Sequence, residues 1–202
     1  MTIRAVFFDY GGVIQRTEHQ APRQRLAERF GMDYADIDEI VFGGGPNGTA
    51  AQATVGAIGE DEHWRAVARR LKVKNGEIEN IKTEFYAGDV IDREFVDFIR
   101  SLRGKFHVGL ISNAWDGMRA YLEKNDLLAV FDTVIISAEV KAAKPGVEIY
   151  RLALEQAQVK ANEAVFVDDV PANIEACQQV GMQGVLFKDP QDAMRQLKRL
   201  LK

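Results

Sequence analysis

Short apolar runs alternate along most of this chain with segments whose apolar residues recur every three or four positions. The runs at residues 3–8, 106–111, 133–136, 164–167 and 184–187 have the length of buried strands. Helical spacing is seen in Phe95, Phe98, Ile99 and Leu102; in Met118, Tyr121 and Leu122; in Ile149, Leu152 and Ala153; and in Ile174, Cys177 and Val180. This alternation predicts an α/β protein with a Rossmann-like, doubly wound parallel sheet.

Residues 17–88 break the alternation and contain no clear strand. Trp64, Val67, Ala68 and Leu71 form one helical stripe, and Ile78, Ile81, Phe85 and Tyr86 form another. We therefore expect an inserted helical cap at residues 17–88 and a sheet-containing core at residues 1–16 and 89–202. The glycine-rich segment 43–48 lacks the Lys-Ser/Thr ending of a phosphate loop and is interpreted as a connection. We place His63 on the cap surface.

Composition narrows the classes of function without identifying one. The 202 residues carry a formal net charge of −4, which argues against nucleic acid or an anionic membrane as the main partner. Cys177 is the single cysteine, so neither an intrachain disulfide nor a cysteine-rich zinc site is expected, and we interpret it as a buried core thiol. No apolar run reaches the length of a membrane span. We expect a cytoplasmic protein, monomeric or homodimeric.

Polar residues follow or adjoin several of the predicted strands. Asp9 follows the first strand, Ser112-Asn113 follows the second, Lys144 precedes a helix, and Asp168-Asp169 follows the strand at 164–167. Each has a structural explanation by itself, as a helix cap, a turn former or a solvated charge. Because the carboxyl ends of parallel strands share one sheet edge, the groups can also converge. Together they supply a nucleophile, hydrogen-bond donors, a cation and an acidic pair, which favours an active site.

These motifs resemble those of the haloacid dehalogenase-like (HAD) hydrolase superfamily. Residues 9–13 are similar to its first motif, Ser112-Asn113 to the second, Lys144-Pro145 to the third, and residues 166–173 to the fourth. The stretches 144–150 and 166–173 most resemble a branch that includes glucose-1-phosphate phosphatase-like proteins and the N-terminal phosphatase domain of soluble epoxide hydrolase. The resemblance spans nearly the whole chain and implies a HAD core with an inserted helical cap.

The resemblance also implies a role for each motif residue. Asp9 would be the nucleophile that forms an aspartyl-phosphate, and Lys144 would offset the charge of Asp9 and of the phosphoryl group. Magnesium would be held by Asp9, the carbonyl of Gly11 and the Asp168-Asp169 pair, with Asp169 favoured over Asp168 as the direct ligand. The implied phosphate-binding residues are Ser112, Asn113 and Lys144, and Asn173 would orient the acidic pair.

Gly11 departs from the pattern of most phosphatases of this superfamily, which carry an aspartate there as general acid and base. Its absence favours substrates whose leaving group needs little protonation, such as anomeric sugar phosphates, acyl phosphates and aryl phosphates. Glu18 and His19 are candidate substitutes, although a solvated position at the entry to the cap is the more typical interpretation of both. Tyr10 is expected to face the cap. Trp115 either stacks on a substrate or anchors the following helix against the core.

The leading interpretation is an enzyme, a Mg²⁺-dependent phosphatase of a small phosphorylated metabolite such as a sugar 1-phosphate. A metal-independent 2-haloacid dehalogenase is the first alternative, and the Asp168-Asp169 pair argues against it because that chemistry needs no metal. The second alternative is a non-catalytic phosphoryl- or protein-binding module that kept the fold and lost the aspartate at position 11. The sequence leaves the substrate open, because cap residues select it.

Overall fold

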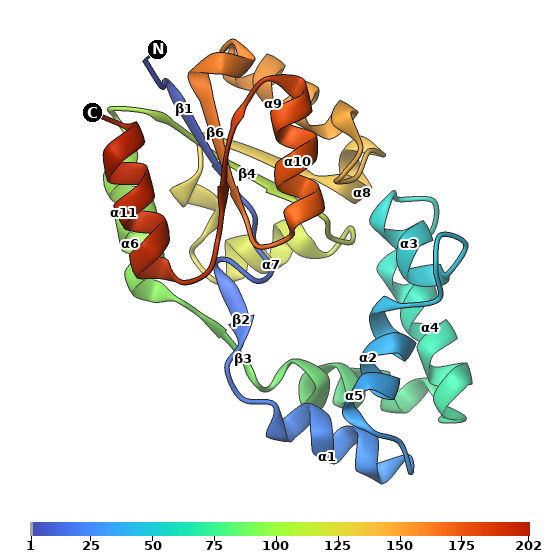
Figure 1. Ribbon diagram of the computed structural model, residues 1–202. Helices are drawn as coiled ribbons and strands as arrows, with labels where there is room; N and C mark the ends of the chain where they lie inside the picture. The colour runs from blue at the N-terminus through green and yellow to red at the C-terminus, as the bar shows by residue number, and fades with distance from the viewer. Residues whose placement is uncertain (1) are drawn as a thin grey trace.

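A five-stranded parallel sheet forms the centre of the larger part of the molecule in the computed structural model, which describes residues 2–202 (Figure 1). The strand order is β5-β4-β1-β6-β7, with the first strand in the middle. The strands span Ala5–Phe8 (β1), His107–Ser112 (β4), Thr133–Ile136 (β5), Ala164–Asp168 (β6) and Gln183–Leu186 (β7). Parallel pairing puts all their carboxyl ends on one edge.

Helices cover both faces of this sheet because successive strand residues point to opposite sides. Val6 and Phe8 of β1 join one apolar cluster, and Ala5 and Phe7 join the other. The first cluster lies against α6 (Arg93–Leu102), α7 (Met118–Lys124) and α11 (Pro190–Leu200), and the second against α9 (Val147–Ala157) and α10 (Pro171–Val180). A short helix, α8 (Ser137–Val140), follows β5.

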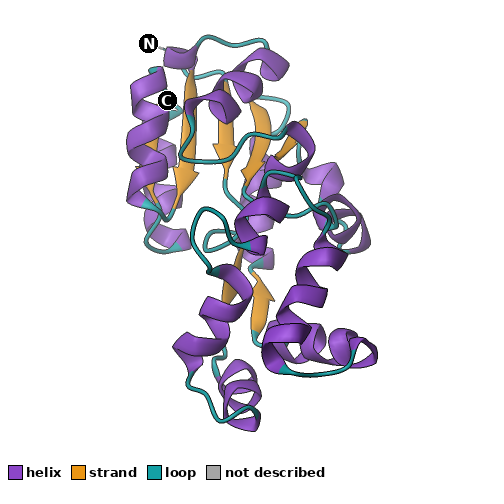
Figure 2. Cartoon of the chain, turned by 90° about the vertical axis from the view of Figure 1, so that its right-hand side faces the viewer, coloured by secondary structure: helices purple, strands orange, loops and turns teal. Residues whose placement is uncertain are grey.

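Five helices form a separate group, here called the helical lobe. They are α1 (Ala21–Arg29), α2 (Tyr34–Phe42), α3 (Thr49–Thr54), α4 (Glu60–Leu71) and α5 (Ile78–Tyr86). The lobe has an apolar cluster of its own, in which Trp64 and Phe85 are fully buried. It lies at the carboxyl ends of the strands, and the strand arrows in Figure 2 point toward it.

A two-stranded antiparallel ribbon joins the lobe to the sheet. It pairs β2 (Gln15–Thr17) with β3 (Asp89–Ile91), so both connections to the lobe run side by side (Figure 1). Three short 3₁₀ turns complete the described elements, at Asn75–Glu77, Leu128–Val130 and Ala161–Glu163. Over residues 2–202, no helix combines the length and the apolar character that a membrane crossing requires.

The predicted α/β class and doubly wound parallel sheet are confirmed, and every predicted strand has a counterpart within two residues. Two local predictions were wrong. Thr17 belongs to a strand, although residues 17–88 were expected to contain none. His63 is 1% exposed because its ring packs against Trp115, with a centroid separation of 4.4 Å.

Candidate active site

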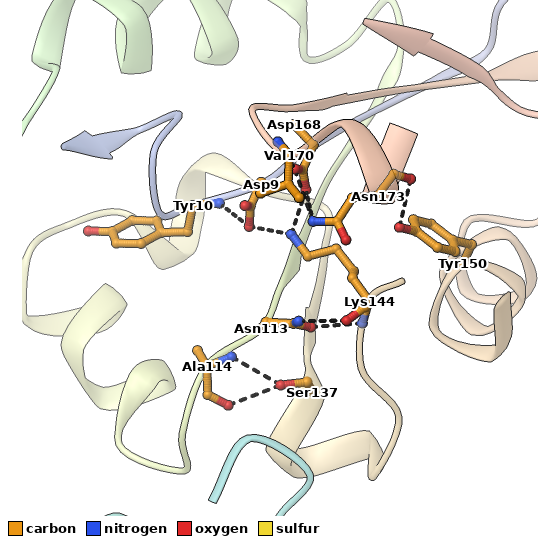
Figure 3. Close-up of polar contacts among 10 residues, drawn as sticks. All are labelled: Asp9, Tyr10, Asn113, Ala114, Ser137, Lys144, Tyr150, Asp168, Val170 and Asn173. Atoms are coloured by element: carbon orange, nitrogen blue, oxygen red, sulfur yellow. Dashed lines mark hydrogen bonds and ion pairs between the residues drawn. The ribbon is translucent and has the colours of Figure 1, made fainter. Parts of the chain in front are cut away.

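A buried lysine joins two carboxylates at the carboxyl edge of the sheet. Lys144 Nζ lies 2.6 Å from Asp9 Oδ1 and 2.7 Å from Asp168 Oδ2 (Figure 3). Asp9 follows β1 directly, and Asp168 ends the neighbouring strand β6. All three residues are at most 7% exposed. Partners of opposite charge are what allow such groups to be buried, so Lys144 is a structural part of this centre and not a solvated surface charge.

Asp168 is fully occupied by protein donors. Besides Lys144, it accepts hydrogen bonds from Asn173 Nδ2, 3.0 Å from each carboxylate oxygen, and from the backbone N–H of Val170 at 2.8 Å. The Tyr150 hydroxyl in turn donates to the Asn173 carbonyl at 2.9 Å. These contacts fix the Asp168 carboxylate beside Lys144 at the end of β6.

Asp9 keeps one carboxylate oxygen available. Its Oδ1 contacts Lys144 Nζ and accepts the Tyr10 N–H at 2.7 Å, whereas Oδ2 accepts no hydrogen bond from residues 2–202. Burial raises the pKa of Asp9 above the usual carboxyl range, and the Lys144 ammonium acts in the opposite direction. The side chain is thus held at one oxygen and free to react or bind at the other.

The loop after β4 is held to the segment that carries Lys144. Asn113 Nδ2 donates to the Lys144 carbonyl at 2.9 Å, and the Lys144 N–H donates to Asn113 Oδ1 at 2.8 Å. Ser137 Oγ lies 3.0 Å from the N–H of Ala114 and 3.2 Å from its carbonyl. The Asn113 side chain is therefore a positioning group here, while Ser112, 3% exposed at the strand end, faces the adjoining cavity.

Sequence reasoning missed Ser137 and Tyr150. Ser137 directly follows the strand Thr133–Ile136, so the rule that selected the other strand-end residues also points to it. Tyr150 carried no comparable signal, since its place in an apolar helical stripe is typical of core residues.

Asp9, Asp168 and Asp169 can each offer one oxygen within 4.8 Å of the others, a spacing that suits one cation. Asp169 is the exposed member, and burial together with the charge of Asp168 raises its pKa. Its carboxylate lies over Gly12, where an added Cβ would be 2.2 Å from Asp169 Oδ2. The donor set is all oxygen, which fits Mg²⁺. Because the oxygens of Asp168 are already bonded, Asp169 and Asp9 are the better placed ligands.

A cavity of about 980 Å³ lies between this sheet edge and the helical lobe. Gly11, Ser112, Asn113 and Lys144 line its sheet side. The lobe and ribbon supply charged, amide, hydroxylated and aromatic groups, namely Gln15, Thr17, Arg23, Phe42, Glu60, Lys82, Tyr86 and Asp89. The volume is that of a small-molecule site.

The arrangement agrees with a comparison against protein families. The family model described as "Haloacid dehalogenase-like hydrolase" matches residues 6–187, which reach from the second residue of β1 past the end of β7. The chain belongs to the haloacid dehalogenase-like hydrolase family. The predicted membership and the prediction of a hydrolase are therefore confirmed.

The named relatives of this HAD hydrolase are distant in sequence. The bifunctional epoxide hydrolase 2 of Sus scrofa is 27% identical over 217 residues, covering 99% of this chain. The chain spans only 39% of the length of that protein. A phosphorylated carbohydrates phosphatase of Thermotoga maritima is 25% identical over 197 residues, covering 91% of this chain and 84% of the relative.

A solved HAD enzyme from Bacteroides thetaiotaomicron, in complex with magnesium and inorganic phosphate, superposes with a TM-score of 0.76. It is 24% identical and the alignment covers 92% of this chain and 94% of that one. At this identity, the likeness shows the HAD fold.

Two aromatic residues, Tyr10 within the first motif and Trp115 shortly after the second, line the cavity of this HAD hydrolase. The Tyr10 hydroxyl donates to Gln15 Oε1 at 2.7 Å, and its ring meets Tyr121 edge to face. Trp115 packs on Phe42, His63 and Trp64 of the lobe, so it does not anchor the following helix against the core as one prediction had it.

The candidate substitute acids lie elsewhere. Neither Glu18 nor His19 is among the cavity-lining residues. Glu18 forms an exposed ion pair with Arg16 at 3.2 Å, and the backbone of His19 bonds to Gly88 beside the ribbon. The interpretation of both as residues at the entry to the lobe fits these contacts better than an acid–base role.

Proposed function

We propose that this HAD hydrolase is a Mg²⁺-dependent phosphatase that acts on a small phosphorylated metabolite through an aspartyl-phosphate intermediate. The observation that carries the proposal is the Asp9 carboxylate, which is buried at the sheet edge and fixed at Oδ1 by Lys144, while its Oδ2 accepts no hydrogen bond from the described residues, 2–202. A nucleophilic carboxylate needs this kind of fixed, charge-compensated position with one oxygen accessible.

In the proposed reaction Asp9 attacks phosphorus, its new O–P bond forms, and the bond from phosphorus to the leaving oxygen breaks. The leaving oxygen takes a proton from solvent, because Gly11 supplies no acid, and water then hydrolyses the aspartyl-phosphate to restore Asp9 and release inorganic phosphate. Lys144 stabilises negative charge on the transferring group, which is the main contribution proteins make to phosphoryl transfer. The Ser112 hydroxyl and the backbone amide N–H of Asn113 are the proposed donors to the phosphate oxygens.

Magnesium fits the donors at this site. Asp9, Asp169 and the carbonyl of Gly11 are the proposed ligands, while Asp168 supports the site through Lys144 and Asn173. The ion would neutralise charge on the phosphoryl oxygens when bound.

We assign residues 17–88 as a cap and residues 1–16 and 89–202 as the catalytic core. The lobe has its own apolar cluster, and it meets the core across a cavity that both parts line. A cap in this position shields the phosphoryl group from bulk water and contacts the leaving group.

The leaving group proposed for this site needs little protonation, because Gly11 supplies no acid. A sugar 1-phosphate meets this requirement, since the anomeric oxygen departs more readily than an alkyl oxygen. We expect faster turnover of glucose 1-phosphate than of glucose 6-phosphate. A clear preference for the 6-phosphate contradicts this part of the proposal.

The proposal is tested by measuring phosphate release with Mg²⁺, with EDTA, and with EDTA followed by excess Mg²⁺. Chelation is expected to abolish turnover and the added ion to restore it. Asp9→Asn, which keeps the size of the side chain but lacks the nucleophilic carboxylate, is expected to lose at least ~10³-fold in kcat. Asp97→Asn, an exposed change on α6, is the matched control. Full activity of Asp9→Asn, or halide release from 2-haloacids without Mg²⁺, overturns the assignment.

A further inference from the structure

The cavity wall opposite the catalytic residues carries an ion pair that the proposed chemistry does not use. Lys82 Nζ of α5 lies 3.2 Å from Glu60 Oε1 at the start of α4, and Trp64 Nε1 donates to the same oxygen at 3.2 Å. The Lys82 and Glu60 side chains are only 18% and 27% exposed. Both residues line the cavity that Ser112 and Lys144 line from the sheet side.

Glu60 lies where the lobe meets the loop after β4. Its N–H donates to Asp116 Oδ1 at 2.9 Å, which holds the first turn of α4 against that loop. Its Oε2 lies over Gly117, 2.3 Å from the position a Cβ would take, and accepts no hydrogen bond from residues 2–202. A partly buried carboxylate oxygen is thus available beside the loop that begins with Ser112 and Asn113.

Trp115 adds an apolar surface next to this pair. Its ring lies 6.1 Å from Trp64 and 4.4 Å from His63, and the residue lines the cavity. Contacts to the lobe fix its orientation, so it is a preformed platform and not a mobile side chain. A few fixed polar groups beside an aromatic surface are typical of sites that orient a small ligand.

This combination discriminates between two kinds of leaving group. A long apolar chain would remove water from Glu60 and Lys82 and return no hydrogen bonds, which is unfavourable for partly buried charges. A polyhydroxylated group restores those bonds, because its hydroxyls can donate to Glu60 Oε2 and accept from Lys82, while its C–H face lies on Trp115.

We propose that Glu60 and Lys82 determine substrate specificity by binding hydroxyl groups of the leaving group, so that the substrate is a phosphorylated sugar or polyol. This inference rests on the proposed phosphatase function. The two residues act on binding of the leaving group and touch neither the phosphoryl group nor its nucleophile.

The test compares kcat/KM with Mg²⁺ for a panel of hexose, pentose and polyol phosphates, for p-nitrophenyl phosphate and for farnesyl phosphate. Glu60→Gln and Lys82→Met keep the side-chain size and remove the charge. For each variant, kcat/KM for the best sugar phosphate divided by kcat/KM for p-nitrophenyl phosphate is expected to fall about tenfold. The fall should come mainly from a higher KM for the sugar phosphate. Glu79→Gln is the matched control, because Glu79 also pairs with Lys82, at 3.4 Å, but is 83% exposed and does not line the cavity.

The outcomes separate the inference from the function on which it rests. An unchanged ratio in both Glu60→Gln and Lys82→Met, with circular dichroism showing folded protein, overturns the inference alone. A wild-type preference for farnesyl phosphate overturns it as well. Absence of turnover for every ester overturns the phosphatase function together with the inference.

Discussion

Gly11 and Gly12 are neighbours in the chain, but a side chain at each position would meet different surroundings. A Cβ built on Gly11 has no heavy atom within 4 Å, and Gly11 is not among the glycines with positive φ. A Cβ on Gly12 would be 2.2 Å from Asp169 Oδ2, and the backbone there has a φ of +78°. Only Gly12 is therefore fixed by geometry, and Gly11 is free to carry a side chain.

We expect Gly11→Asp to fold and to gain activity on alkyl monoesters such as glucose 6-phosphate. The new carboxyl group would supply the missing proton donor, and general acid–base assistance is typically worth ~10²–10⁴-fold. Steady-state kinetics on glucose 6-phosphate and glucose 1-phosphate measure the effect, with Gly11→Ala as the control for adding a Cβ. If the alkyl ester gains nothing, the missing acid is not what limits this site.

Gly12→Ala is expected to weaken the binding of Mg²⁺. Its Cβ displaces the Asp169 carboxylate from the position in which it complements Asp9, and the positive φ adds backbone strain. Titration of activity with Mg²⁺ should show a raised requirement for the ion relative to Gly11→Ala. Equal metal dependence of the two alanine variants would exclude Asp169 as a ligand.

Asp92, directly after the ribbon strand β3, makes two side-chain contacts, one to the following helix α6 and one to the ribbon. Asp92 caps α6 by accepting the Phe95 N–H at 2.9 Å, and it pairs with Arg16 of β2 at 2.8 Å. Asp189 caps α11 in the same way, through the Asp192 N–H at 2.8 Å, but no ion pair joins it to the ribbon. The two residues differ mainly in the ribbon contact.

Asp92→Ala is therefore expected to cost more stability than Asp189→Ala. Loss of a cap typically costs about 1 kcal/mol, and a partly exposed ion pair adds roughly 0.2–1 kcal/mol. Urea unfolding of the two variants measures the difference in the free energy of unfolding. Equal losses would mean that the Arg16 pair contributes nothing to the junction.

Elements with a continuous apolar signal could be predicted, and the ribbon could not. β1 and β6 are buried on both faces, so β1 is an uninterrupted apolar run and β6 is apolar up to its last residue, Asp168. β2 consists of Gln15, Arg16 and Thr17, three polar residues that pair with β3 some 74 residues later, and neither composition nor period marks such a strand. The pairing of β2 with β3 is determined by the tertiary structure and not by a local sequence signal.

The candidate site likewise contains residues that the sequence pattern could predict and residues whose positions depend on tertiary packing. Asp9, Ser112 and Asp168 converge because parallel strands end at one edge, which the sequence pattern already implies, whereas Lys144 reaches them from the loop before α9. The burial of His63 and the contacts of Trp115 depend on how the lobe packs on the loop after β4, which leaves no periodic trace.

At the scale of the whole molecule, the lobe meets the sheet-containing part at two places, with the cavity between them. One is the ribbon, and the other is a close approach of the α3–α4 connection to α8 and to the loop after β4. There, a Cβ on Gly56 would be 2.2 Å from the Ala138 carbonyl oxygen, and the Glu60 N–H donates to Asp116. The second contact encloses the cavity on the side away from the ribbon.

Gly56→Ala is expected to open this contact, because the added methyl cannot coexist with the Ala138 carbonyl. Gly31→Ala is the matched control, since Gly31 has nearly the same φ, +67° against +64°, but no heavy atom within 4 Å of its Cβ position. Both variants carry similar backbone strain, about 1 kcal/mol, and Gly56→Ala loses the Ala138 contact in addition, so its free energy of unfolding should fall at least as much. Only Gly56→Ala should shift the lobe relative to the sheet.

A displacement of about 1 Å at a reacting site can cost ~10²-fold in rate, so kcat/KM should fall far more for Gly56→Ala than for Gly31→Ala. Equal kinetic effects would show that the α3–α8 contact does not govern closure of the cavity, and that the ribbon alone positions the lobe over Asp9.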